Sequence, residues 1–263
     1  MRTVKDEKTD AITKKAWERN WEDISMDEIM EIFKYHRVKK QMDVFTRVLP
    51  KNGKILEGGC GLAPYLIRLR QLGYDVEGID YNEAPLKKAH SFDPELPLKT
   101  GDVNAIPYPD NTFGGYISLG VIEHFTEGPL QAIREERRVL KMGGVFVLMV
   151  PQNHIFMRLT APVRALKRSK TLRRLLKKPE DTYYWEQYFK RGELVPLLER
   201  EGFAVKEIHA MDHSHSFVSF SDFFRDKNTF DEASPLALRL GDWTAKHMKW
   251  PFACQLLIIG YKK

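Results

Sequence analysis

Hydrophobic positions in most of this chain alternate between two spacings. Short apolar runs predict β-strands, and they are separated by segments with apolar residues every three to four positions, which predict helices. Repeated β–α units predict an α/β fold with a doubly wound, seven-stranded, mainly parallel sheet covered by helices on both faces. The predicted strands are residues 54–58, 74–80, 96–103, 113–120, 145–151, 203–211 and 254–262. The predicted helices are residues 64–73, 82–90, 129–141 and 193–202. The third of these helices is expected to end at the glycines of "MGG".

Three segments lie outside this alternation. Residues 8–48 have helix-like spacing, with Trp17 and Trp21 four positions apart. Two long connections leave the carboxyl ends of strands, where α/β sheets bind their ligands, and connections of this length are often lids. The predicted division is a helical N-terminal flap (1–50), a core (51–151), a basic helical cap insertion (152–191), and a C-terminal part of the core (192–263) with a second cap insertion (212–252).

Composition agrees with a globular protein. The chain has 263 residues, of which 43% are hydrophobic, and no apolar run approaches the roughly 18 residues of a membrane span. The start, "MRTVKDEKTD", lacks the apolar core of a signal peptide. Two cysteines, Cys60 and Cys254, do not suggest a disulfide framework. These features predict a cytoplasmic protein.

The net charge of +6 is concentrated in the first insertion. Residues 152–179 contain no acid, and basic residues alternate there with leucines, which predicts a basic amphipathic element. A solvated cap face, peripheral contact with an anionic membrane through residues 158–178, a phosphorylated substrate and RNA are the alternatives. The basic residues are Arg158, Arg164, Lys167, Arg168, Lys170, Arg173, Arg174, Lys177 and Lys178.

The segment "LEGGCGLAP" (56–64) has the strand–turn–helix pattern of a nucleotide-binding loop. Glu57 beside the glycines opposes a pyrophosphate, and Ala63 stands where a third glycine would be expected. Asp80 follows Gly61 by 19 positions, about the distance of a ribose-binding acid. Asp102, at the end of the third predicted strand, can accept a hydrogen bond from an adenine amino group. A ligand with an adenosine, an ammonium group and no phosphate suits all three acids, and S-adenosylmethionine is such a ligand.

The motifs "LEGGCGLA", "GID", "GDV", "SLGVIEHF" and "VLKMGGVFVLMVP" resemble those of class I S-adenosylmethionine-dependent methyltransferases, in particular the small-molecule group with an E-x-G-C-G loop. The resemblance covers residues 53–151, with a weaker similarity in "GELVPLLEREGF". It implies a Rossmann-like methyltransferase fold, an enzyme, and S-adenosylmethionine as the cofactor.

The resemblance also implies roles for individual residues. Glu57 would hold the methionine ammonium, and Asp80 the ribose. The remaining implied cofactor contacts are Gly59, Cys60 and Gly61 along the methionine, Tyr81 beside the adenine, Asp102 and the Val103 amide at the adenine edge, and the Leu119 carbonyl at the ammonium.

The catalytic candidate is His124 in "VIEHF", as a general base, although Glu123 and His124 could instead only brace this loop. A metal is disfavoured, because Gly120 stands where similar quinone-pathway enzymes have a further acid. In "HAMDHSHSF", His213 or His215 is a candidate to face the substrate, and His209 completes the group.

The predicted function is methyl transfer to a small-molecule acceptor, with oxygen favoured over nitrogen or carbon, and with a lipid-linked or anionic substrate as an option. Nucleic acid is disfavoured, because "SLGV" replaces the "D-P-P-Y"-like motif of enzymes that methylate its amino groups. An NAD(P)-dependent Rossmann oxidoreductase and a non-catalytic S-adenosylmethionine-binding protein are the alternatives. The pattern predicts no particular oligomeric state.

Overall fold

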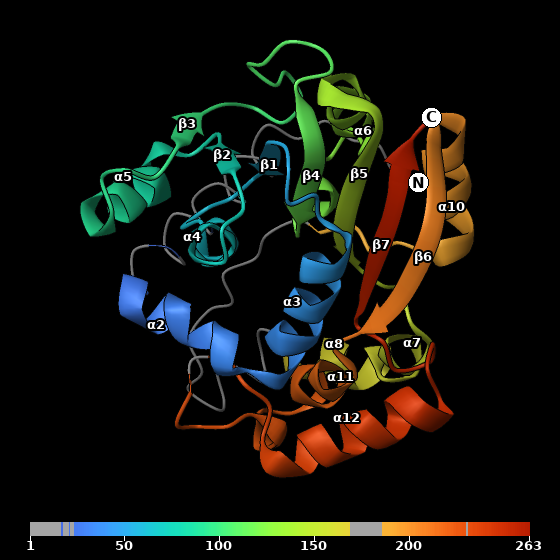
Figure 1. Cartoon of the computed structure of the whole chain (residues 1–263). Helices are drawn as coiled ribbons and strands as arrows, with labels where there is room; N and C mark the ends of the chain where they lie inside the picture. Colours follow the sequence, from blue (N-terminus) through green and yellow to red (C-terminus); the bar gives the residue numbers. More distant parts are fainter. Residues whose placement is uncertain (1–16, 18–20, 22–23, 169–185, 230) are drawn as a thin grey trace.

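A computed structural model describes residues 17, 21, 24–168, 186–229 and 231–263 (Figure 1). Its centre is a seven-stranded sheet in the order β3-β2-β1-β4-β5-β7-β6. Every neighbouring pair is parallel except the two pairs that include β7. The predicted doubly wound, mainly parallel sheet is therefore confirmed. The strands are β1 Ile55–Gly58, β2 Val76–Asp80, β3 Leu98–Thr100, β4 Phe113–Leu119, β5 Leu140–Pro151, β6 Phe203–Met211 and β7 Gln255–Lys262.

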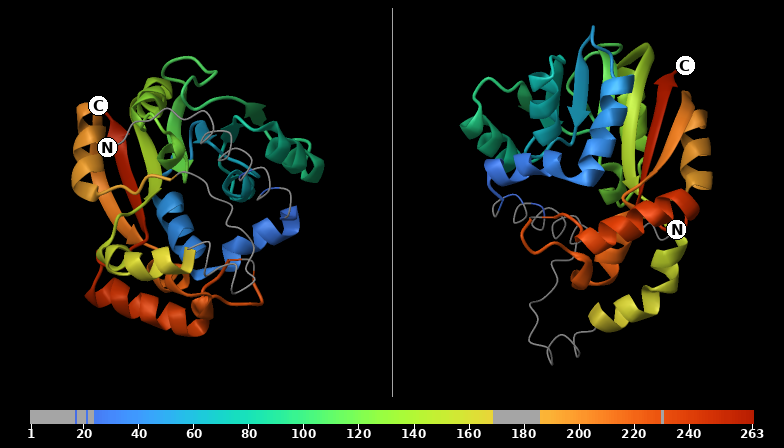
Figure 2. Two further views of the ribbon diagram at one scale, coloured as in Figure 1. Left: turned by 180° about the vertical axis from the view of Figure 1, so that it is seen from behind. Right: turned by 60° about the horizontal axis from the view of Figure 1, so that its bottom comes forward.

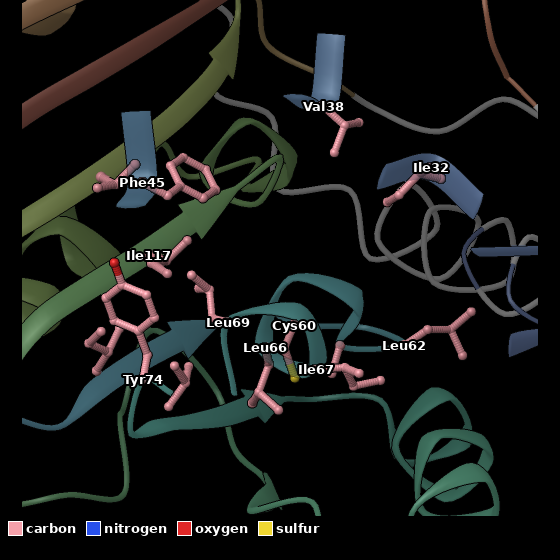
Figure 3. Close-up of a cluster of buried hydrophobic side chains, with 14 of the residues drawn as sticks. Ile32, Val38, Phe45, Cys60, Leu62, Leu66, Ile67, Leu69, Tyr74 and Ile117 are labelled. Atoms are coloured by element: carbon pink, nitrogen blue, oxygen red, sulfur yellow. The ribbon is translucent and has the colours of Figure 1, made fainter. Parts of the chain in front are cut away.

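Helices cover both faces of the sheet because its central strands are buried on both sides. One face packs against α3 His36–Val48, α4 Pro64–Gln71 and α5 Glu83–Phe92. Figure 3 shows this cluster, in which Phe45 of α3 and Leu69 of α4 lie near Ile117 of β4. The opposite face packs against α6 Leu130–Val139 and α10 Arg191–Arg200.

Two helical predictions differ from the structure by more than a few residues at an end. The helix predicted to end at "MGG" already ends at Val139, and β5 begins at Leu140, which pairs with Phe113 beside an irregularity in the ladder. The glycine stop was therefore wrong: Gly143 has φ +71° inside the extended start of β5. The described part of the N-terminal helical segment is divided into α2 Met26–Met30, the 3₁₀ helix η1 Glu31–Lys34 and α3. The extended backbone of Tyr35 separates η1 from α3.

The helices that the structure describes in the two insertions lie at the carboxyl edge of the sheet (Figure 1). Because β7 is antiparallel, its first residue, Gln255, pairs with the last residues of β5 and β6, Pro151 and Met211. The first insertion contains α7 Ile155–Leu159 and α8 Ala161–Arg168; the second contains α11 His213–Phe220, the 3₁₀ helix η3 Asp222–Phe224 and α12 Pro235–His247. Residues 169–178 of the basic segment lie outside the described residues.

The N-terminal helices join this arrangement through α3. The backbone N–H of His36 donates to Glu232 (2.9 Å), and Lys40 donates to Asp242 of α12 (3.1 Å). None of the helices in the described residues is long and apolar enough to cross a membrane. The predicted division into flap, core and caps stays a proposal.

Candidate functional site

The glycine loop after β1 is held against the end of β2. The backbone N–H groups of Gly59 and Cys60 both donate to the carbonyl of Ile79 (2.8 and 3.0 Å). Gly59 and Gly61 have positive φ (+71° and +54°), which glycine adopts without strain. Ala63 also has a left-handed backbone (φ 56°) immediately before α4. The loop therefore keeps a left-handed turn where a third glycine was expected, although the residue is alanine.

Protein side chains lie close to each glycine of this loop. A Cβ atom at Gly58 would lie 2.0 Å from the hydroxyl oxygen of Tyr116, and one at Gly59 would lie 2.5 Å from Val121. One at Gly61 would lie 2.9 Å from the Trp21 ring. The absence of side chains at these glycines thus lets the loop after β4 and the Trp21 ring pack closely against the glycine loop, which is the proposed cofactor loop.

Glu57 is a buried carboxyl group at the carboxyl end of β1. The residue is only 4% exposed, and its Oε2 atom has no hydrogen-bond partner. Burial raises the pKa of Glu57 to about 8, although the backbone N–H of Leu66 donates to the carboxylate and opposes this shift. The negative charge of Asp80 raises the pKa further. A cationic ligand group would satisfy the unpaired oxygen and the charge.

Asp80 lies on the neighbouring strand and organises the loop. The backbone N–H of Gly61 donates to its Oδ2 atom, and that of Asn82 donates to its Oδ1 atom, both at 2.9 Å. Burial raises the pKa of Asp80, and these two hydrogen bonds oppose the rise. Each oxygen keeps a second lone pair, so the carboxylate can still accept hydrogen bonds from ligand hydroxyls.

The remaining predicted cofactor residues differ in their exposure and in their position relative to the strand ends. Asp102 is exposed, lies two residues beyond the end of β3, and accepts a hydrogen bond from the Asn104 backbone (2.8 Å). Tyr81 is 49% exposed, whereas Val103 is buried. Leu119 is the last residue of β4.

Cys60 belongs to the loop but not to its open side. Its thiol side chain is buried in the cluster beneath α4 (Figure 3). Its amide donates to Ile79 and its carbonyl accepts from Ala63 (2.7 Å). Burial raises the pKa of the thiol well above its ordinary value. Cys60 therefore contributes to the shape of the loop. A contact with a ligand would have to use its backbone amide or carbonyl, which already make hydrogen bonds within the protein.

The catalytic candidate lies on a 3₁₀ helix, η2 Ile122–His124, that follows β4. His124 is half-buried, and the Trp17 ring meets it edge-on with 5.2 Å between ring centres. Glu123 beside it is buried, its Oε2 atom has no hydrogen-bond partner, and burial raises its pKa well above the ordinary value. The backbone N–H of Gln187 donates to the Glu123 carbonyl (2.8 Å), so the first insertion returns beside this helix.

Trp17 and Trp21 are site residues that the sequence did not indicate. Their rings stack with 5.4 Å between centres, and Lys88 of α5 donates to the Trp21 carbonyl (2.8 Å). The pair therefore bridges from Gly61 on the cofactor loop to His124. Their spacing of four residues predicted a shared helix face, and only the tertiary structure shows what that face covers.

The three histidines of "HAMDHSHSF" have different partners. His209 lies on β6 and bonds to Glu207 (2.8 Å), and His213 bonds to the Lys249 carbonyl (2.7 Å). Both ring nitrogens of His215 are buried without a hydrogen-bond partner, and its Nε2 atom is 3.7 Å from Asp231. Within the described ranges, no three His, Cys, Asp or Glu side chains gather as a metal site would require.

Half-buried charged side chains gather at Asp231, beside His215. Asp231 accepts from Arg37 of α3 (2.7 Å) and from Arg225 (2.6 Å). Asp212, with φ +59°, has a buried Oδ1 atom without a partner. Burial raises the pKa of Tyr65 at the start of α4, and Asp212 and Glu57 both add to this rise while Arg37 opposes it. The Tyr65 hydroxyl donates to Gln41 of α3 (2.5 Å).

The aromatic pair gives a direct optical test of this site. We expect S-adenosylhomocysteine to change the tryptophan fluorescence, because a ligand on the loop must contact or displace the Trp21 ring. Trp21→Phe should lose most of the change, and Trp243→Phe, whose indole is exposed on α12, should keep it. A signal that survives in Trp21→Phe and disappears in Trp243→Phe would contradict this placement.

Known proteins resemble the chain in the region of this site. The family model described as a methyltransferase domain matches residues 56–148. A probable S-adenosylmethionine-dependent methyltransferase of Mycolicibacterium smegmatis is 27% identical over 159 residues, which are 60% of this chain and 55% of that protein. The demethylmenaquinone methyltransferase of Staphylococcus epidermidis is 32% identical over 124 residues, 44% of this chain and 51% of that protein. The chain thus spans about half the length of these relatives.

Solved structures show the same fold over nearly the whole chain. An S-adenosylmethionine-dependent methyltransferase of Thermotoga maritima superposes with a TM-score of 0.59 at 18% identity. The superposition covers 95% of this chain and 99% of that one. At this identity the similarity concerns the fold.

Proposed function

We propose that this protein, whose core is a class I S-adenosylmethionine-dependent methyltransferase domain, transfers a methyl group to the oxygen of a small-molecule acceptor. The observation that supports it most is the buried carboxyl group of Glu57, whose Oε2 atom is unpaired beside a left-handed glycine loop. An unpaired buried carboxyl group is costly in an empty site. The methionine ammonium of the cofactor would remove that cost.

The residues at this edge fit the cofactor. Glu57 would hold the ammonium together with the Leu119 carbonyl, and Asp80 would accept from the ribose hydroxyls. Asp102 and the Val103 amide would bind the adenine edge, with Tyr81 beside the ring. When bound, S-adenosylmethionine supplies an electrophilic methyl group. The stacked pair Trp17 and Trp21 would exclude water from the loop.

The acceptor is proposed to enter between η2 and the second insertion. His124, on η2 after β4, would take a proton from an acceptor hydroxyl. On the second insertion, the ring nitrogens of His215 have no hydrogen-bond partner, although its Nε2 atom lies 3.7 Å from Asp231. The similarity to a demethylmenaquinone methyltransferase supports an acceptor of the quinone or hydroquinone class. We therefore propose a hydroxylated aromatic acceptor. Methylation on its oxygen is proposed from His124 as a base for the hydroxyl proton, and not from that similarity.

The test uses cofactor with an isotopically labelled methyl group and a panel of hydroquinones and catechols. We expect label in a product whose methyl carbon is bonded to oxygen, which nuclear magnetic resonance distinguishes from a ring-carbon methyl group. Binding of S-adenosylmethionine without label transfer to the panel or to metabolite extracts would support the non-catalytic alternative. Binding of NADH in its place would support the oxidoreductase.

His124→Asn tests the proposed base. We expect kcat to fall by about 10²–10⁴-fold, while calorimetry gives an unchanged affinity for S-adenosylhomocysteine. A variant that keeps its kcat would show that His124 only braces the loop.

A further inference from the structure

The first insertion carries an apolar stripe that no other part of the described chain covers. Ile155, Leu159, Val163 and Leu166 are 47%, 74%, 44% and 63% exposed. They follow one another at intervals of four, four and three residues, the spacing of one helical face. Only Thr160 separates α7 from α8. Figure 2 shows these two helices at the outer end of the molecule, beyond the carboxyl edge of the sheet.

The same insertion is anchored to the rest of the cap on another side. The Phe156 ring packs against Phe252 and Phe217, with 4.9 and 5.7 Å between ring centres. The backbone N–H of Phe156 also donates to the Pro251 carbonyl (3.1 Å). The Phe156 side chain therefore fixes α7 on the second insertion, while the Leu159 side chain stays exposed.

Charge identifies the surface that such a stripe would meet. Residues 152–179 contain no acid, and they include the exposed Arg158 together with Arg164, Lys167 and Arg168 on or beside α8. Basic residues that flank an apolar helical face are suited to anionic headgroups above an apolar layer. RNA would be attracted by the same charge but gives no reason for exposed leucines.

We propose that α7 and α8 lie in the headgroup region of an anionic lipid bilayer, with Ile155, Leu159, Val163 and Leu166 toward the acyl chains. The surface adjoins the carboxyl edge of the sheet, where the proposed cofactor site opens. If the proposed methyl transfer is correct, the bilayer then also supplies or receives the acceptor. The binding itself does not depend on that activity.

Co-sedimentation with vesicles of equal parts phosphatidylcholine and phosphatidylglycerol tests the proposal. We expect the full-length protein to sediment with them at low salt and partly at moderate salt. Leu159→Ser combined with Leu166→Ser should lower the partition coefficient on the order of 100-fold, since each buried leucine contributes roughly tenfold. Leu72→Ser is the matched control: it changes a leucine that is 39% exposed at the end of α4 and should leave the partition unchanged.

Three results would overturn the proposal. They are no sedimentation at low salt, sedimentation that the two serines do not alter, and binding to an RNA oligonucleotide without binding to vesicles. Calorimetry with S-adenosylhomocysteine shows that each variant is folded. If no form of the protein binds that ligand, the proposed function fails while the vesicle result still decides the surface.

Discussion

Glu57→Gln should make the protein more stable above neutral pH and at the same time weaken its binding of S-adenosylmethionine. The pKa of Glu57 is about 8 in the folded protein, against an ordinary value of 4.5. As pH rises from 4.5 to 8, the unfolded chain loses this proton before the folded one, so the folded state loses stability over that window. The loss is fully present above pH 8 and absent below pH 4.5.

A glutamine does not titrate and should escape this loss. At about 1.4 kcal/mol per pKa unit, the variant should gain on the order of 3–5 kcal/mol relative to the unaltered protein above pH 8. Urea unfolding across this pH window measures the gain. Affinity for the cofactor should fall roughly 10- to 100-fold in calorimetry, because a charged hydrogen bond to the ammonium is lost.

Glu136→Gln is the matched control for this experiment. Glu136 of α6 is also buried, has an unpaired Oε1 atom, and has a pKa that burial raises well above its ordinary value. It lies in the cluster on the opposite face of the sheet. Its glutamine variant should gain stability with rising pH but keep the cofactor affinity. Equal losses of affinity in both variants would show that Glu57 has no special contact with the cofactor.

Asp80→Ala is expected to weaken binding of the cofactor strongly and to destabilise the fold. The change leaves the backbone N–H groups of Gly61 and Asn82 without their acceptors. Two such losses cost about 2–5 kcal/mol together, and the ribose hydroxyls would lose their proposed partner. We expect the cofactor dissociation constant to rise at least roughly 100-fold, measured by calorimetry, and the urea midpoint to fall.

Asp93→Ala separates the two effects of this change. Asp93 also accepts a hydrogen bond from a nearby backbone N–H, that of Glu95 (3.0 Å), but it follows α5 away from the loop. Its variant should lose little stability and no affinity. Unchanged cofactor binding in folded Asp80→Ala would refute the ribose role and leave Asp80 as a structural residue of the loop.

Local patterns in the sequence were sufficient to predict the sheet and the chemistry of its edge. Apolar runs alternating with helical spacing specify β–α units, whose parallel strands place successive carboxyl ends at one edge. Glu57 and Asp80 were therefore predicted to lie together, and β1 and β2 are indeed paired. The methyltransferase fold followed from the order of these motifs.

Other features depend on contacts between distant segments, and sequence spacing does not report those. The antiparallel direction of β7 returns both insertions to the carboxyl edge. His215 differs from His213 because only His213 reaches a carbonyl, that of Lys249. Trp21 reaches Gly61, and α6 gives way to β5 at Leu140 because the chain can pair there with Phe113. The sequence by itself determined the alternation of strands and helices and the acids at the strand ends. The tertiary structure decided which polar atoms stay unpaired and which residues cover the glycine loop, because both depend on burial and long-range packing.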